Sequence, residues 1–182
     1  MPVLVWAAFV ILTLIEGYII FRLAKKKEAA LIKNVVPAYL LFTAYFITAH
    51  FGQLRVPEAV MIFAMASLLV HTLLGLYLRM YGRSKTFDRG SHAFGCFSYS
   101  MLAYFSLTSL FSESIPPALA GIIIASLGVT LGVFVELIEF ALDSRKHIEL
   151  KLQKGLRDTN FDLLFDIIGS SLAGVFAGLV LL

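Results

Sequence analysis

Residues 161–182 read FDLLFDIIGSSLAGVFAGLVLL, an apolar run interrupted by two carboxylates. About 20 apolar residues suffice for one helical crossing of a bilayer, so this stretch predicts a membrane helix. Asp158, Asp162 and Asp166 recur at every fourth residue and therefore share one helix face. Ionisable side chains are expensive inside a membrane helix, and by default they mark a functional site.

The rest of the chain is equally apolar. Of its 182 residues 59% are hydrophobic and 15% are charged, and the mean hydropathy is +0.88. This composition predicts an all-α, polytopic membrane protein without a separate soluble domain. We expect a single transmembrane domain over residues 1–182, a six-helix bundle with helices at about 3–23, 35–51, 58–79, 91–111, 117–142 and 161–182. Pro37, Pro57 and the Pro116-Pro117 pair are interpreted as helix starts, where a missing backbone N–H has no partner to lose.

The basic residues predict the orientation of the bundle. Fourteen of the fifteen Lys and Arg residues follow the first, third or fifth helix, and only Arg55 falls on the other side. By the positive-inside rule these three loops are cytoplasmic and both termini face outward, as in a multi-pass protein of the cell membrane. The net charge of +3 follows from these loops and from contact with membrane lipids, so it requires no nucleic-acid partner.

With this topology, acidic and histidine side chains from five helices fall at a similar depth. At about 1.5 Å of rise per residue they lie within roughly 5 to 15 Å of the cytoplasmic boundary. The set is Glu16, His71, His92, Glu136, Glu139, Asp162 and Asp166. We therefore expect these side chains to converge.

Smaller features surround this set. Gly128 and Gly132, and the series Ser170, Gly174 and Gly178, predict faces of close helix contact. Thr159-x-x-Asp162 has the spacing of a capping box, which offers Asp162 a structural role. The single cysteine, Cys96, lies in an apolar run and is expected to pack as a small hydrophobe.

Carboxylates and imidazoles are the ligand set for a divalent metal ion, and also for a proton relay. The metal-ligand candidates are His92, Glu136, Glu139, Asp166, Asp88 and His71, and the carboxylates with catalytic potential are Glu136, Asp166 and Glu139. The spacing does not specify which metal. A purely structural alternative pairs acids with bases at helix ends, such as Glu16 with Arg22 and Asp162 with Arg157.

Three ordered motifs carry a resemblance to a known family. They are Phe87-Asp88-Arg89-Gly90-Ser91-His92, then Glu136-Leu137-Ile138-Glu139, then Gly155-Leu156-Arg157-Asp158-Thr159 leading to Asp162-Leu163 and Asp166-Ile167-Ile168-Gly169. Together they resemble the VanZ-like superfamily, most of all its YjdF-type branch of bacterial and archaeal integral membrane proteins. VanZ itself has Gln and Asn where Glu139 and Asp166 stand, so this chain is more acidic. The resemblance implies a cytoplasmic-side polar site made from Asp88, His92, Glu136, Glu139, Asp162 and Asp166.

Three functions from different classes remain open. The first is a membrane enzyme of envelope homeostasis that acts on a lipid or lipid-linked substrate, with a divalent metal ion and a carboxylate base, and with Arg89, Arg145 and Arg157 meeting a substrate phosphate. The second is a proton- or cation-coupled carrier. The third is a non-catalytic membrane assembly protein whose polar residues set helix packing. The sequence specifies neither the substrate nor the oligomeric state, and it favours an enzyme slightly, since no broken helix or repeat indicates alternating access.

Overall fold

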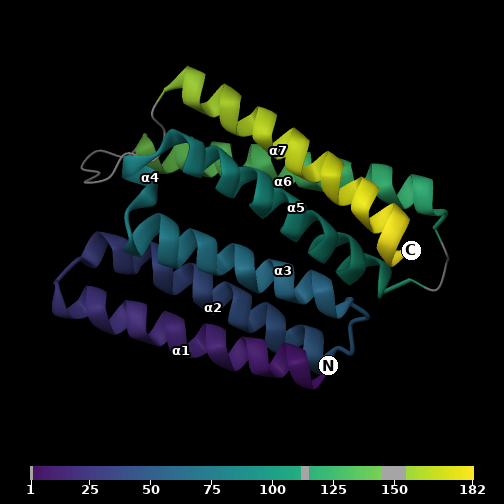
Figure 1. Cartoon of the computed structure of the whole chain (residues 1–182), viewed down its shortest axis with the longest axis horizontal. Helices are drawn as coiled ribbons and strands as arrows, with labels where there is room; N and C mark the ends of the chain where they lie inside the picture. Colours follow the sequence, from purple (N-terminus) through teal and green to yellow (C-terminus); the bar gives the residue numbers. More distant parts are fainter. Residues whose placement is uncertain (1, 112–114, 145–154) are drawn as a thin grey trace.

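The computed structural model describes residues 2–111, 115–144 and 155–182, and every regular element among them is helical. In chain order these are α1 (Val3–Lys25), α2 (Ala29–Phe51), α3 (Glu58–Leu69) with the π-helix η1 (Val70–Tyr77), α4 (Met80–Arg83), α5 (Lys85–Thr108), α6 (Pro117–Asp143), and α7 (Leu156–Phe176) with the π-helix η2 (Ala177–Leu181). Figure 1 shows two layers, one made by α1 to α3 and the other by α5 to α7. Packing of α3 against α5 joins the layers.

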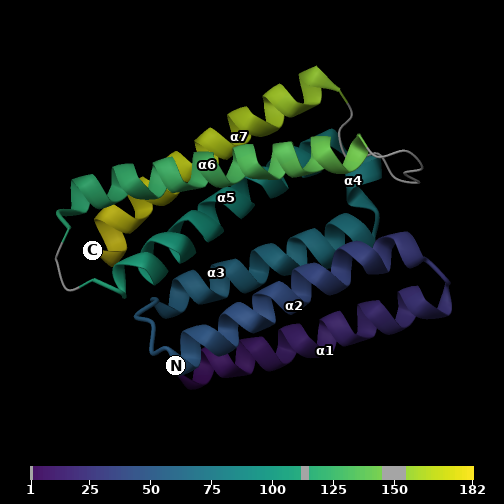
Figure 2. The same cartoon turned by 180° about the vertical axis from the view of Figure 1, so that it is seen from behind.

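The two ends of the bundle differ. The turn between α1 and α2, the short helix α4 and the start of α7 lie at one end, and both termini lie at the other (Figures 1 and 2). The first end carries Lys25, Lys26, Arg79, Arg83 and Arg157. The predicted gathering of basic residues at one end is therefore present in the fold.

The fold is that of a polytopic membrane bundle. Among the described residues, α1, α2, α3 with η1, α6, and α7 with η2 are long and apolar enough to cross a bilayer. The remaining long helix, α5, is too polar to be counted with them, because its first turns carry Lys85, Asp88 and Arg89 and the rest of it carries His92 and a series of serines and tyrosines. Large apolar side chains such as Leu14, Phe134 and Leu137 are exposed on the outside, as expected for a surface that faces lipid.

The interior is built from two apolar clusters. The larger one joins the layers through buried side chains that include Phe46, Met61, Met101 and Ile124, and the smaller one joins α1, α2 and η1. Between α6 and α7 the backbones approach so closely that a β-carbon on Gly121 would lie 2.9 Å from the carbonyl oxygen of Gly174. The predicted small-residue packing face of the last helix is therefore confirmed.

Three predicted helix starts were wrong, and the first two are those of α2 and α5. Helix α2 begins at Ala29 rather than 35, which places Pro37 inside it. Burial of Leu31 and Val35 in the smaller cluster holds this first part in helical form, although the proline removes one backbone hydrogen bond. Helix α5 begins at Lys85 rather than 91 and ends at Thr108 rather than 111. The hydroxyl of Ser84 accepts a hydrogen bond from the Phe87 N–H at 3.1 Å, and this cap fixes the earlier start.

The start of the last helix was also predicted too late. Helix α7 begins at Leu156 instead of 161, after Gly155 with a φ of 116°. This φ is one that glycine adopts readily, so the chain turns there into the helix. Thr159 lies within the helix and Asp162 is buried, so the predicted capping box was wrong. The helix predicted to reach residue 79 instead ends at Tyr77 in the π-helix η1.

Candidate functional site

The centre of the candidate site is a pair between α5 and α7. The Nδ1 atom of His92 lies 3.1 Å from the Oδ1 atom of Asp166, with side chains that are 12% and 1% exposed. The thiol of Cys96 donates to the same oxygen at 3.1 Å. Cys96 follows His92 by one turn, so both side chains reach the carboxylate from one face of α5. Cys96 is therefore a polar partner of Asp166 as well as a buried small side chain, which the sequence interpretation missed.

Glycines create the space for this pair. A β-carbon on Gly132 of α6 would overlap the carboxylate of Asp166, and one on Gly169 of α7 would overlap the backbone of Ala93 on α5. One turn further along α7, the Ser170 hydroxyl donates to the Asp166 carbonyl at 2.5 Å. The Oδ2 atom of Asp166 is buried and has no hydrogen-bond partner in the described part of the chain. The three helices α5, α6 and α7 thus close around one carboxylate.

Next to this pair lies a group that we call the three-donor cluster, consisting of His92, Glu136 and Asp162. One ligand atom from each residue lies within 4.8 Å of the others, and Glu136 and Asp162 are both buried. The residues come from α5, α6 and α7. An ion that forms bonds of about 2.0 to 2.6 Å fits among donor atoms at such separations. Asp162 also belongs to a second group with the same spacing, together with Asp88 and Asp158.

The other predicted ligands lie outside the three-donor cluster. Asp166 is a neighbour of His92 rather than a member, and Glu139 is in neither group formed by the described residues. His71 bonds through Nδ1 to the Tyr81 hydroxyl at 2.8 Å. The structure thus brings together residues of α5, α6 and α7, whereas in the first layer His71 bonds to Tyr81 and Glu16 bonds to Thr72.

Tyr81 connects the first layer to α5. Its hydroxyl lies 2.8 Å from His71 Nδ1 and accepts from the Ser91 hydroxyl at 3.3 Å, and Ser91 directly precedes His92. A β-carbon on Gly75 of η1 would overlap the Tyr81 ring, so this glycine provides the space for the ring. Burial raises the pKa of Tyr81 to about 12. Sequence reasoning missed Tyr81 because a tyrosine between two helices carries no periodic signal.

Glu16 forms a separate polar contact in the first layer. It is fully buried, and its Oε1 lies 2.5 Å from the hydroxyl of Thr72 on η1. That hydroxyl has one proton and also lies 2.9 Å from the Leu68 carbonyl. Arg22, the partner expected in the structural alternative, donates instead to the Tyr18 hydroxyl at 2.9 Å. The predicted pair between Glu16 and Arg22 was therefore wrong.

Two of the three predicted phosphate-binding arginines meet at one aromatic ring. The guanidinium carbon of Arg89 lies 4.0 Å from the ring centroid of Phe161, and that of Arg157 lies 5.9 Å from it. Arg157 is thus placed on Phe161, not in the expected ion pair with Asp162. The third arginine, Arg145, lies outside the described residues.

The fold and its buried polar centre define the class, a polytopic helical membrane protein. Residues 2–181 match the family described as "Predicted membrane protein (DUF2238)", and the chain belongs to this family. It is 33% identical over 117 residues to an uncharacterized protein of Thermotoga maritima, an alignment that covers 63% of this chain and 59% of the relative. The alignment thus spans less than two thirds of the relative's length. No solved structure matches the chain.

Proposed function

We propose that this protein binds a divalent cation at the three-donor cluster and acts on a membrane lipid or lipid-linked substrate in cell-envelope homeostasis. The observation that carries the proposal is the spacing within 4.8 Å of donor atoms from His92, Glu136 and Asp162. Three helices supply one donor each, and two of these donors are buried carboxylates. Two carboxylates and an imidazole at this spacing are a donor set that suits a divalent cation.

Asp166 has a different role in this proposal. A carboxylate accepts hydrogen bonds, so the contact with Asp166 places the ring hydrogen of His92 on Nδ1 and leaves the Nε2 lone pair available for a metal. Histidine ligands of metals are commonly oriented by a carboxylate in this way. Asp166 is therefore a positioning residue, and the mixed nitrogen and oxygen donors suit zinc, manganese or iron more than calcium.

When bound, the metal would supply Lewis-acid activation of water or of a substrate oxygen. Three protein ligands leave coordination positions open for such a molecule. Glu139, one turn along α6 from Glu136, is half-buried and lies in neither donor group of the described residues, so it is the carboxylate that we expect to act as general base. The basic residues at the same end of the bundle support the assignment of the site to the cytoplasmic leaflet, with both termini outside.

A carrier coupled to protons or cations is the second candidate. It is favoured by Glu16, a fully buried acid in the layer that does not contain the three-donor cluster, whose Oε2 has no hydrogen-bond partner in the described segments. It predicts pH-dependent or cation-dependent flux in proteoliposomes, and flat flux would exclude it. The kinship with the VanZ-like superfamily and its YjdF-type branch remains a proposal based on the three sequence motifs.

The metal content of the purified full chain tests the proposal. We expect a bound divalent metal by elemental analysis, and a lower unfolding temperature after chelation. Glu136→Gln removes a ligand and should abolish occupancy, while Asp166→Asn should weaken affinity by about 10- to 100-fold through His92. Glu58→Gln makes the same chemical change at an exposed position at the opposite end and should leave occupancy unchanged.

Absence of metal together with an unfolding temperature that is insensitive to added or chelated metal would overturn the proposal. The assembly alternative predicts a different result. The same substitutions would then change the unfolding temperature, and neither the parent protein nor any variant would bind metal. Each pattern is distinguishable from the others by elemental analysis combined with thermal unfolding.

A further inference from the structure

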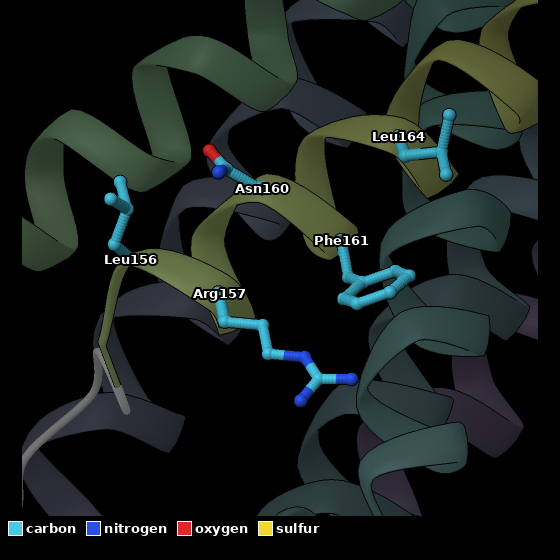
Figure 3. Close-up of a pocket in the computed structure, with 5 residues that line it drawn as sticks. All are labelled: Leu156, Arg157, Asn160, Phe161 and Leu164. Carbon is cyan, nitrogen blue, oxygen red and sulfur yellow. The ribbon is translucent and has the colours of Figure 1, made fainter.

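We propose that Arg89, Phe161 and Arg157 form a binding site for the phosphate of an anionic membrane lipid, which we call the arginine–phenylalanine site. The identification of this lipid as the substrate class rests on the proposed function. The binding site itself is argued from the contacts of its three residues. The guanidinium carbon of Arg89 on α5 lies 4.0 Å from the Phe161 ring centroid, and that of Arg157 on α7 lies near the same ring at 5.9 Å. In Figure 3, Arg157 and Phe161 extend to the same side of α7, while Leu156 and Asn160 extend to the other.

The two arginines of this site form no ion pair with another described residue. In the described part of the chain, the Nε of Arg89 is buried without a hydrogen-bond acceptor. The buried Nε shows that protein groups cover the inner edge of this guanidinium without neutralising it, so a ligand oxygen would have to meet its terminal N–H groups. Arginine stacked on an aromatic ring keeps its N–H groups directed outward in its own plane, where they match the oxygens of a phosphate.

The surroundings favour a lipid over a soluble phosphate. Leu156, Arg157, Asn160, Phe161 and Leu164 line an open depression of about 330 Å³ on α7. Leu156 and Leu164 are strongly exposed, at 78% and 47%. An acyl chain can cover these leucines while the phosphate meets Arg157, since cationic side chains near a helix end lie at headgroup level. A free phosphate would leave this apolar wall without a partner.

The arginine–phenylalanine site adjoins the three-donor cluster. Phe161 directly precedes Asp162, and Arg89 lies almost one helical turn before His92 on α5. A phosphate held by these arginines would therefore lie about one helical turn from the cluster along α5 and α7, and the proposed cation would offset repulsion from the acids. In this arrangement the phosphate end of the lipid, rather than its acyl chains, lies towards the three-donor cluster.

Native mass spectrometry of the detergent-solubilised full chain tests the inference, with phosphatidylglycerol as the probe. Arg157→Gln should lower its retention by about tenfold, the loss expected for one charge-assisted contact. Arg83→Gln removes one exposed positive charge at the same end and should change retention by less than about twofold. Because Arg89 is half-buried, Arg89→Lys serves as the second variant; it keeps the charge and should still weaken retention, since lysine cannot bind bidentately.

Three results would overturn the inference. Equal losses in Arg157→Gln and Arg83→Gln would indicate general surface charge. Retention of diacylglycerol as strong as that of phosphatidylglycerol would remove the role of the phosphate. Displacement of the lipid by glycerol 3-phosphate at similar concentration would indicate a soluble phosphate instead of a lipid.

The same preparations separate this inference from the proposed function. Glu136→Gln should lose metal but keep site-specific lipid retention, because Glu136 is not part of the arginine–phenylalanine site. Lipid retention that depends on Arg157 in a protein without metal would overturn only the proposed function. Metal binding without lipid retention that depends on Arg157 would overturn only this inference.

Discussion

Substitution of Gly169 by alanine should separate α5 from α7 and break the centre of the site. A β-carbon at this position would lie 2.6 Å from the carbonyl carbon of Ala93 and 2.7 Å from its α-carbon, whereas ordinary contact begins at 3.4 Å. These are backbone atoms and cannot rotate away. The nearest atom is the carbonyl oxygen of Ala93, which the β-carbon would overlap. Relief of the carbonyl-carbon contact alone requires the helices to move apart by about 0.8 Å, the oxygen requires more, and such overpacking costs about 1 to 3 kcal/mol.

The same movement changes the pair between His92 and Asp166. If this pair opened with the helices, its separation of 3.1 Å would grow to about 3.9 Å or more, beyond hydrogen-bond range. Gly169→Ala should therefore lose both stability and metal affinity, measured by chemical unfolding in detergent and by elemental analysis. Gly90→Ala is the matched control, because a β-carbon on Gly90 of α5 has no neighbour within 4 Å. If both variants were as stable as the parent protein, the close approach of α5 and α7 at Gly169 would be refuted.

Three further predictions concern the first layer and its connection to α5. Gly75→Ala should displace the Tyr81 ring and cost about 1 to 3 kcal/mol in chemical unfolding, whereas Gly82→Ala, with open space around it, should not. The raised folded pKa of Tyr81 predicts stability that is fully present below pH 10 and lost as the pH rises towards 12, so the unfolding temperature of Tyr81→Phe should vary less over that range. Glu16→Gln should remain close to parent stability because an amide can still bond to Thr72, whereas Glu16→Leu should leave the hydroxyl with only the Leu68 carbonyl and should unfold more easily; equal stability of the two variants would contradict a role for this contact.

The sequence predicted the depth of the polar side chains in the membrane, but it did not predict which helices they contact. Counting residues from the basic loops placed Glu16 and His92 at similar depth, yet Glu16 bonds to Thr72 in the first layer while His92 meets Asp166 in the second. Depth follows from the rise of a helix, which is the same in every sequence. The neighbours of each side chain depend on how six helices pack. A single sequence contains no periodic pattern from which this packing can be predicted.

The division of roles within the site was also beyond the sequence. Asp162 and Asp166 share a helix face, and the capping spacing drew Asp162 towards a structural role. In the fold Asp162 lies in the three-donor cluster, whereas Asp166 contacts His92 outside that cluster. Spacing of four residues fixes a face, but one turn of displacement decides which carboxylate joins the three-donor cluster.

Helix starts failed where tertiary burial outweighed local signals. Pro37 looked like a boundary, but Leu31 and Val35 before it are buried against the smaller cluster. Helix propensity and proline penalties amount to a few kcal/mol, which packing of an apolar face can offset. The apolar segments themselves were recognisable because the length needed to cross a bilayer leaves little freedom.

The polarity of α5 has a consequence for how the protein is made. Lys85, Asp88 and Arg89, followed by His92 and a series of serines, give this helix little tendency to partition into lipid by itself. Its partners α6 and α7 are synthesised later, so at the translocon α5 precedes the helices that satisfy its polar groups. We expect α5 to enter the bilayer late, together with α6 and α7, and a ribosome-bound chain truncated before α7 should leave it accessible to water-soluble reagents.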